Sequence, residues 1–390
     1  MLDCSPSWLA PEPLRRFALP SFLNFGYIYT LWIILAYIPL YLTDLGFSHF
    51  QISVLISTFP LSSLALLIPF GIFCDRLPPK RLVTTGFILF AIFLTGLRWV
   101  EEFPSLLVFF IIGGIGGSLF RISCSSLYYK LLGEGNTGKK LGFYMGIGLL
   151  GYGLGPLTGG FLLAEVSMTS LLWIAFFILL PFLFLSLFLE DVKLAKFELG
   201  EYRRDIARKE VLVLIVLTFL LALHLGVEQT SFSLFLKENI DLTENSIGRM
   251  FCFIGIAIAT LSIATGFISD SVTGRGMRLG AILYLGLLLS GLFNISLLFV
   301  GAFGTVLMVR LLHVLGDSLF LVSRMVIVSN LFLPERIGGN LGVLDTTIFV
   351  GTFVGAIASG AIPGYLYPFV FAGSLAILAL LPTIAVRPKL

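Results

Sequence analysis

Long apolar runs alternate with short polar turns along almost the whole chain. Each run supplies roughly the 20 residues that an α-helix needs to cross about 30 Å of hydrocarbon. The pattern therefore predicts an all-α integral membrane protein with twelve transmembrane helices. The predicted runs cover residues 17–42, 49–74, 82–100, 104–131, 141–163, 167–189, 211–236, 246–269, 278–299, 302–332, 338–360 and 364–386.

The composition agrees with this pattern and narrows the function. The chain is 57% hydrophobic and 12% charged, whereas a soluble domain carries about 25% charged residues. The net charge of +3 arises from cations in short turns rather than in one patch, so no nucleic-acid partner is expected. Cys4, Cys74, Cys124 and Cys252 form no CxxC pair, and the three histidines form no HxxxH or HxxE pair. Neither a metal site nor a cofactor is therefore expected.

The connections between runs divide by charge. One alternating set holds most of the Lys and Arg, and the other set is mainly acidic. The positive-inside rule then places both termini in the cytoplasm and the chain in the cytoplasmic (inner) membrane. In the longest polar connection, Glu201 and Asp205 lie one helical turn apart beside Arg204 and Arg208, which favours a surface helix. The predicted domains are a cytoplasmic tail 1–16, a six-helix bundle 17–189, a linker 190–210, a second six-helix bundle 211–386 and a cytoplasmic tail 387–390.

The two halves repeat at an offset of 200 residues. GSLF at 117–120 returns as DSLF at 317–320. The further matches join Gly138, Leu141, Gly142, Gly151, Gly155 and Gly160 to Gly338, Leu341, Gly342, Gly351, Gly355 and Gly360. An internal duplication of membrane helices is typical of transporters whose site lies between the repeats near mid-membrane.

A polar turn at 71–81, GIFCDRLPPKR, joins the second and third runs. Gly71 permits close approach of another helix, and Asp75 can face the positive N-terminus of a neighbouring helix. Arg76 and Arg81 hold the turn in the cytoplasm. A weaker copy half a chain later comprises Gly266, Asp270, Arg275 and Arg278. An ordinary turn would account for one copy but not for its repetition.

This turn and its copy resemble the loop 2–3 signature of the major facilitator superfamily and its degenerate echo in loop 8–9. The resemblance covers residues 17–386. It implies two pseudo-symmetric six-helix bundles, with helices 1, 4, 7 and 10 around a central cavity.

The fifth run contains GYGLGPLTGG at 151–160. Its glycines allow helices to pack closely, and its proline allows a kink. The string resembles the GxxxGPxxGG signature of the antiporter branch of the same superfamily, carried here by Gly151, Gly155, Pro156, Gly159 and Gly160. Two interpretations stay open: a close-packed helix crossing, or a role in setting the direction of export.

Ionisable residues inside the predicted spans are costly to bury and are candidates for function. They are His224 and Glu228 in the seventh run, Arg310, His313, Asp317 and Arg324 in the tenth, Arg121 in the fourth and Asp345 in the eleventh. Spacings of three, four and seven residues place those of the tenth run on one stripe. Counting from the helix ends gives pairs at equal depth, which are Glu228 with Arg310, His224 with Asp317 and Arg324 with Asp345.

These groups can carry a coupling proton. A carboxylate buried beside His or Arg holds its proton with an affinity that depends on its surroundings. We hypothesise that Asp317 or Glu228, with His313 and His224, takes the proton on one side and releases it on the other. The alternative is fixed ion pairing between helices, which is the prediction for Arg324 and Asp345.

Three other residues are assigned to the substrate path. Arg121 stands alone in the fourth run. It contacts an anionic substrate group, pairs with a carboxylate to reset the carrier, or snorkels to the cytoplasmic surface. Asn24 and Tyr27 share one face of the first run, and their alternative is packing. Aromatic cavity residues bind apolar or cationic groups, and the 38 Phe favour a hydrophobic or amphiphilic substrate.

A secondary transporter explains the duplicated turn and the buried charges better than a channel or scaffold does. An enzyme would need a nucleophile–base or metal constellation, which the sequence does not offer, and no Walker motif supplies ATP energy. The predicted function is proton-coupled export of a small hydrophobic or amphiphilic compound by alternating access, by a monomer in the lipid bilayer. Proton-coupled uptake of a small organic solute is the alternative.

Overall fold

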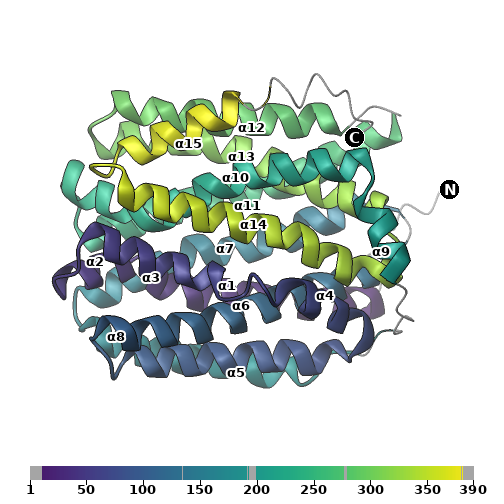
Figure 1. Cartoon of the computed structure of the whole chain (residues 1–390), viewed down its shortest axis with the longest axis horizontal. Coiled ribbons are helices and arrows are strands. Elements are labelled where there is room, and N and C mark those ends of the chain that lie inside the picture. Colours follow the sequence, from purple (N-terminus) through teal and green to yellow (C-terminus); the bar gives the residue numbers. More distant parts are fainter. Residues whose placement is uncertain are drawn as a thin grey trace.

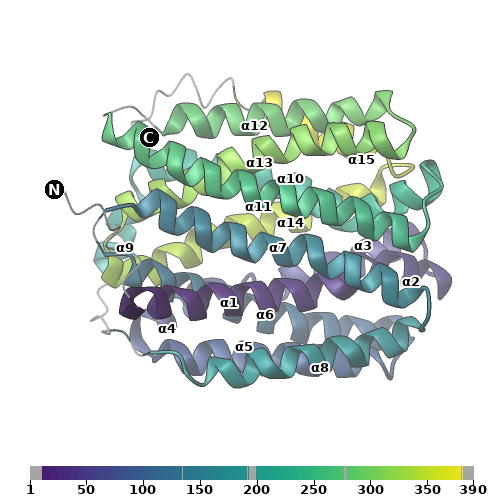
Figure 2. The ribbon, with the colours of Figure 1, turned by 180° about the vertical axis from the view of Figure 1, so that it is seen from behind.

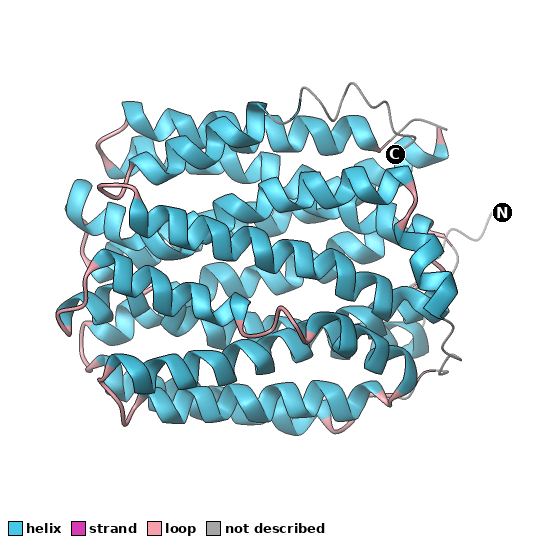
Figure 3. Cartoon of the chain, in the orientation of Figure 1, coloured by secondary structure: helices cyan, strands magenta, loops and turns pink. Residues whose placement is uncertain are grey.

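The computed structural model describes residues 11–133, 135–190, 192, 199–275, 279–378 and 380. Within these residues the chain consists of helices joined by turns and contains no strand (Figure 3). Some predicted features fall outside the described residues. They are Cys4 and the rest of 1–10 in the first tail, 191 and 193–198 in the linker, Arg278, and the tail 387–390.

The described residues of the first half form eight helices, and a short helix links this half to the second. They are α1 (Pro11–Leu35), α2 (Ile38–Asp44), α3 (His49–Leu61), α4 (Leu67–Arg76), α5 (Pro79–Leu97), α6 (Phe103–Leu131), α7 (Thr137–Leu163), α8 (Met168–Ser186) and the linking α9 (Leu199–Ile206). The second half comprises α10 (Lys209–Leu234), the π-helical turn Phe235–Asn239, α11 (Glu244–Gly274), α12 (Gly280–Ile295), the 3₁₀ turns Ser296–Phe299 and Pro334–Arg336, α13 (Phe303–Leu331), α14 (Ile337–Ala361) and α15 (Tyr367–Leu378).

Ten helical segments of the described chain are long and apolar enough to cross a membrane, and α3 and α15 are shorter apolar helices. These twelve segments correspond in order to the twelve predicted runs, so the prediction of a multi-pass all-α membrane protein is confirmed. The first helix begins at Pro11, ahead of the predicted start at residue 17.

The helices lie side by side as two stacked halves (Figure 1), and the view from behind gives the same arrangement (Figure 2). The purple and blue first half lies below the green and yellow second half. Helix α9 lies at one end of the bundle and α2 at the opposite end. We call these the α9 end and the α2 end.

Two seams join the halves: α7 packs against α11, and α3 and α4 pack against α14. Glycine makes the first seam tight. A Cβ built on Gly153 of α7 would lie 2.8 Å from the Cα of Gly255 on α11, too near for any side chain. At this point of the seam the two backbones can therefore approach only because both residues are glycine.

The second predicted run is not one helix, because residues 62–66 form turns between α3 and α4. The break lies beside α6, where a Cβ on Gly114 would collide with the carbonyl oxygen of Phe59. The Ser63 hydroxyl donates to the carbonyl oxygen of Gly114 over 2.7 Å. The expectation of a continuous helix over 49–74 is therefore wrong, because this contact with α6 is tertiary and leaves no periodic signal in the sequence.

Candidate functional site

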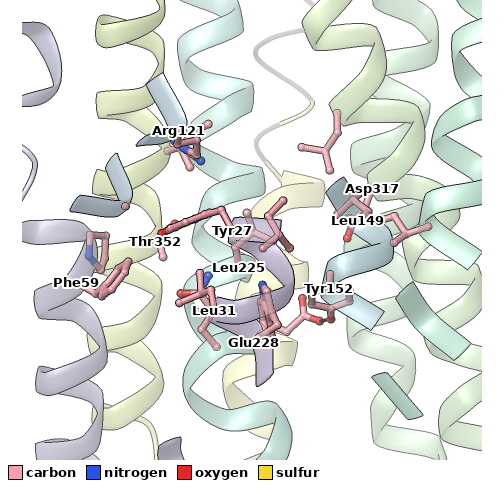
Figure 4. Close-up of a pocket in the computed structure, with 18 of the residues that line it drawn as sticks. Tyr27, Leu31, Phe59, Arg121, Leu149, Tyr152, Leu225, Glu228, Asp317 and Thr352 are labelled. Atoms are coloured by element: carbon pink, nitrogen blue, oxygen red, sulfur yellow. Dashed lines mark hydrogen bonds between the residues drawn. The ribbon is translucent and has the colours of Figure 1, made fainter. Parts of the chain in front are cut away.

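A cavity of about 290 Å³ lies between the halves. Residues from α1, α3, α6, α7, α10, α11, α13 and α14 line it. Its wall is mostly apolar, with Tyr27, Phe59 and Tyr152 among its aromatic side chains (Figure 4). Arg121, Glu228 and Asp317 are the charged residues that reach the cavity.

Glu228 joins the cavity to a buried arginine. Its Oε1 forms an ion pair with Arg310 and accepts a hydrogen bond from the Tyr152 hydroxyl over 3.1 Å. Arg310 is completely buried; it also donates to the Asn294 side chain over 3.3 Å and lies over the ring of Phe232. The structure thus brings together the two residues that depth counting places level, and Glu228 separates Arg310 from the cavity.

Two histidines converge on Asp317. His224 Nε2 lies 3.5 Å and His313 Nε2 lies 3.2 Å from Asp317 Oδ2. His313 Nδ1 lies 2.9 Å from the carbonyl oxygen of Ser290. A carbonyl can only accept, so the proton sits on Nδ1 and the neutral ring presents a lone pair at Nε2. Two lone pairs 3.2 Å apart repel, so this arrangement calls for a positive species, a proton or a metal ion, between imidazole and carboxylate.

The sequence shows Arg121 as an isolated charge in its run, but in the structure it has a partner. Its Nη2 lies 3.2 Å from Asp345 Oδ2, and its guanidinium lies over the Phe349 ring. Arg324 Nη2 lies 3.5 Å from Asp345 Oδ1 and its Nε donates to Thr218. One carboxylate of the second half therefore holds an arginine from each half, because it has two oxygens and lies at the seam.

The two predicted polar residues of α1 have different surroundings. Tyr27 lines the cavity and stacks on Phe120 with ring centroids 4.5 Å apart. Asn24 is buried beside α7, where a Cβ on Gly148 would meet its amide. Asn24 is not among the cavity-lining residues, because its position on α1 turns it toward a glycine of α7.

The α9 end is closed by a carboxylate at a helix N-terminus. Asp75 of α4 accepts the backbone N–H groups of Gly338 and Gly339, over 3.1 and 2.8 Å, in the first turn of α14. These N–H groups have no partner within their own helix, and the helix dipole favours a negative charge there. Lys130 Nζ lies 2.9 Å from the same carboxylate. Gly71 fits here because a Cβ would collide with the carbonyl oxygen of Gly338.

The second copy of the turn makes the same kind of contact, a carboxylate at a helix N-terminus, across the seam between α7 and α11. Asp270 of α11 accepts the backbone N–H groups of Gly138 and Lys139 over 2.7 and 3.0 Å, and Gly266 packs against Gly138. The two contacts exchange the roles of the halves, as an internal duplication requires. Arg76 and Arg81 of the first copy lie on the surface.

Helix α9 adds contacts that the sequence analysis did not anticipate. The Tyr202 hydroxyl donates to Asp75 Oδ2 over 3.1 Å. Burial, and then the nearby Asp75 carboxylate, raise the pKa of Tyr202, so it remains a donor at neutral pH. Arg336 ion-pairs with Glu201 and with Asp205. The predicted surface helix in the linker is thus present, and it also covers this closure.

Neutral contacts close the α2 end. The Tyr37 hydroxyl donates to the carbonyl oxygen of Pro156 over 2.6 Å, and the carbonyl oxygen of Glu244 lies 3.2 Å away. His49 Nε2 lies 3.3 Å from the Ser231 hydroxyl. Tyr37 contacts Pro156 of the string in the fifth run. The glycines of that string pack closely on α1, on Tyr37 between α1 and α2, and on the start of α11; they are Gly151, Gly155, Gly159 and Gly160. The packing interpretation of the string thus has a direct structural basis.

Comparison with known proteins agrees with this architecture. The profile of the Major Facilitator Superfamily matches residues 21–293. The quinolone resistance protein NorA of Staphylococcus aureus strain MSSA476 is 25% identical over 338 residues, covering 85% of each chain. An uncharacterised MFS-type transporter of Methanocaldococcus jannaschii is 21% identical over 347 residues, covering 82% of this chain and 84% of its own. The human organic anion transporter TETRAN superimposes with a TM-score of 0.75 at 15% identity, covering 96% of this chain and all of its own. The match over most of the chain shows that this protein belongs to the Major Facilitator Superfamily of membrane transporters.

Proposed function

We propose that this transporter exports hydrophobic or amphiphilic compounds across the cytoplasmic membrane in exchange for protons. The α9 end faces the cytoplasm in this proposal, because the basic connections lie there. Support for export comes from the Staphylococcus aureus relative, which is named for quinolone resistance. The mostly apolar cavity is of a size that suits a small molecule.

The observation that carries the proposal is the charge balance beside the cavity. Glu228 and Asp317 face one arginine, Arg310. With neutral imidazoles at His224 and His313, the cluster of Glu228, Asp317 and Arg310 has a net charge of −1 by the sum −2 + 1. Arg121 also reaches the cavity, but it is paired with Asp345 and is not counted in this cluster. A net charge is costly in a site of low dielectric, so the cluster favours one added positive charge.

The preference for one added positive charge explains why a proton and a substrate would exchange for one another. A proton neutralises the cluster, and so does the cationic end of an amphiphile in the cavity. Both together would reverse the net charge, so proton and substrate displace one another. This mutual exclusion is the thermodynamic requirement of an antiporter. The aromatic side chains Trp32, Phe59 and Phe349 offer faces for the apolar part or for the cation.

Proton exchange can be measured in proteoliposomes that contain the purified carrier and an internal pH dye. Ethidium and a quinolone serve as probes of different charge. We expect an outward gradient of either probe to draw protons inward. Proton movement in the same direction as the probe would establish symport and refute the proposed exchange.

Variants of the two carboxylates test which of them carries the coupling proton. We expect Asp317→Asn and Glu228→Gln each to reduce probe-driven proton flux by tenfold or more, while probe binding, measured by fluorescence polarisation, is lost less severely. Glu165→Gln removes an exposed carboxylate near the α2 end and is the matched control. Unchanged coupling in Asp317→Asn would remove Asp317 from the role, and unchanged coupling in both would leave the pairs as fixed structural contacts.

A further inference from the structure

We propose that His224, His313 and Asp317, with Glu228 as a fourth donor, form a binding site for a divalent transition-metal ion of the Zn²⁺ class. The sequence analysis expects no metal site because it seeks ligand pairs of known spacing along one helix. Here two helices contribute equally. Each supplies a histidine and, one turn later, a carboxylate: His224 and Glu228 from α10, His313 and Asp317 from α13.

The donor atoms lie near the separations that a metal ion needs. Ligand atoms of His224, Glu228 and His313 all lie within 4.8 Å of one another. The two imidazole Nε2 atoms lie 3.5 and 3.2 Å from Asp317 Oδ2. In a tetrahedral zinc site with bonds of about 2.0–2.1 Å, neighbouring ligand atoms are roughly 3.3 Å apart. Small side-chain rotations would therefore complete the site.

The histidine side chains are prepared for this role. The Ser290 carbonyl holds the proton of His313 on Nδ1 over 2.9 Å, which directs the Nε2 lone pair toward Asp317. Such an outer hydrogen bond is the usual support of a metal-binding histidine. The Nε2 atoms of both histidines and Asp317 Oδ1 are buried without a hydrogen-bond partner. The site thus contains unpaired ligand atoms, and leaving such polar atoms buried without a partner is costly.

The donor set selects the class of ion. Two imidazole nitrogens with carboxylate oxygens suit Zn²⁺, Co²⁺ or Ni²⁺, whereas Mg²⁺ and Ca²⁺ prefer oxygen alone and Cu⁺ prefers sulfur. The dication changes the charge of the carboxylate cluster from −1 to +1, and its bonds to two imidazoles and two carboxylates offset the cost of that charge, which a proton and an organic cation together could not do. A proton added as well would raise the charge further, so the ion replaces the proton. Arg310 remains paired with Oε1 of Glu228. The other oxygen, Oε2, is then available to bind the ion. Glu228 and Asp317 reach the cavity, so an ion that enters the cavity when one end opens can reach them.

Metal binding can be tested without transport. The full-length carrier is purified without a polyhistidine tag, stripped with EDTA and reconstituted in nanodiscs at pH 8. Co²⁺ serves as the spectroscopic probe, because its visible absorption becomes intense in tetrahedral coordination. We expect one Co²⁺ per carrier with the tetrahedral spectrum and displacement by equimolar Zn²⁺. No saturable binding, or binding with the octahedral spectrum alone, would overturn the proposal.

The three histidines of the chain provide a matched set. We expect His224→Ala and His313→Ala to weaken binding by tenfold or more, whereas His49→Ala, at the α2 end, leaves it unchanged. His313→Cys keeps a zinc ligand; it should retain Co²⁺ and add a sulfur-to-metal charge-transfer band, which also shows that the variant folds. Equal affinity in all three alanine variants, or no new band in His313→Cys, would refute the assignment. These readouts do not depend on protons or substrate, so they can fail while the exchange proposed above holds.

Discussion

Replacing Asp75 by Asn should open the α9 end. The Asp75 carboxylate is 1% exposed and accepts two N–H groups of α14 and the Tyr202 hydroxyl. Asparagine has the same shape but no charge, and only one of its two terminal atoms can accept. The substitution therefore weakens the contacts between the first half and both α14 and the linker without removing a side chain.

The structure gives the size of the effect. A hydrogen bond to a charged group contributes about 1.5–3 kcal/mol and a neutral one about 0.5–1.5 kcal/mol. With the amide oxygen in the place of Oδ2, the bonds from Gly339 and Tyr202 become neutral at a loss of about 1 kcal/mol each, and the bond from Gly338 is lost at about 1.5–3 kcal/mol. The total is about 4 kcal/mol, and at roughly 1.4 kcal/mol per tenfold change the ratio of closed to open carriers at this end falls about a thousandfold. The Lys130 contact lies within the first half, so it affects overall stability more than opening.

Spin labels measure the opening. Thr85→Cys and Ser271→Cys place labels on exposed positions of α5 and α11 near the α9 end, one in each half. They are introduced into a carrier in which Cys4 and Cys252 are replaced by Ser. We expect one short distance in the parent carrier and a dominant longer distance in Asp75→Asn. Asp44→Asn, at an exposed carboxylate of the α2 end, is the control. An unchanged distance distribution in a folded Asp75→Asn carrier would refute the argument that this carboxylate holds the end closed.

Three further substitutions test neighbouring parts of the structure. Tyr202→Phe removes one hydrogen bond to the Asp75 carboxylate, worth about 1.5–3 kcal/mol, and should raise the population at the longer distance by about tenfold or more; no shift would limit α9 to a connecting role. Tyr37→Phe removes the hydroxyl contacts at the α2 end and should increase labelling of the cavity from that side by a membrane-impermeant reagent, whereas unchanged labelling would show that packing alone closes it. Arg310→Met leaves Glu228 buried and unpaired and should lower the free energy of unfolding by about 3–5 kcal/mol; thermal unfolding in detergent measures this, and the double variant with Glu228→Leu should recover most of the loss if the pair is the cause.

The sequence predicts well how deep each residue lies across the membrane. Helices that cross one slab have their depth set by residue number, since each residue rises about 1.5 Å. Counting from the ends therefore places Glu228 level with Arg310 and His224 level with Asp317, and these pairs meet in the structure. The sequence alone cannot give the rotation of one half against the other.

The features that sequence reasoning missed depend on how the two halves are oriented against each other, or on how each helix is rotated about its own axis. Arg121 meets Asp345 because a helix of the first half faces the seam there. Asn24 turns away from the cavity because the rotation of α1 points it toward α7, a helix of the same half. The metal-compatible arrangement at Asp317 requires α10 and α13 to present their histidines to one oxygen. A periodic pattern on a single helix carries no record of such a meeting.

The two ends of the bundle are closed by bonds of different strength, and we expect this difference to set which end opens first in the transport cycle. At the α9 end, Asp75 and Asp270 accept backbone N–H groups across both seams, and each bond is assisted by charge. At the α2 end, the two polar contacts described between the halves join neutral groups: Tyr37 with the Glu244 carbonyl and His49 with Ser231. The charges of Asp44 and Lys237 attract each other across this end without a direct ion pair among the described residues. Charged hydrogen bonds contribute about twice as much as neutral ones. The empty carrier should therefore open first at the α2 end, and opening at the α9 end needs the free energy of a change in charge at the cavity. Because Glu228 and Asp317 reach that cavity from the second half, a proton or a cation bound there is the event that can tip the balance.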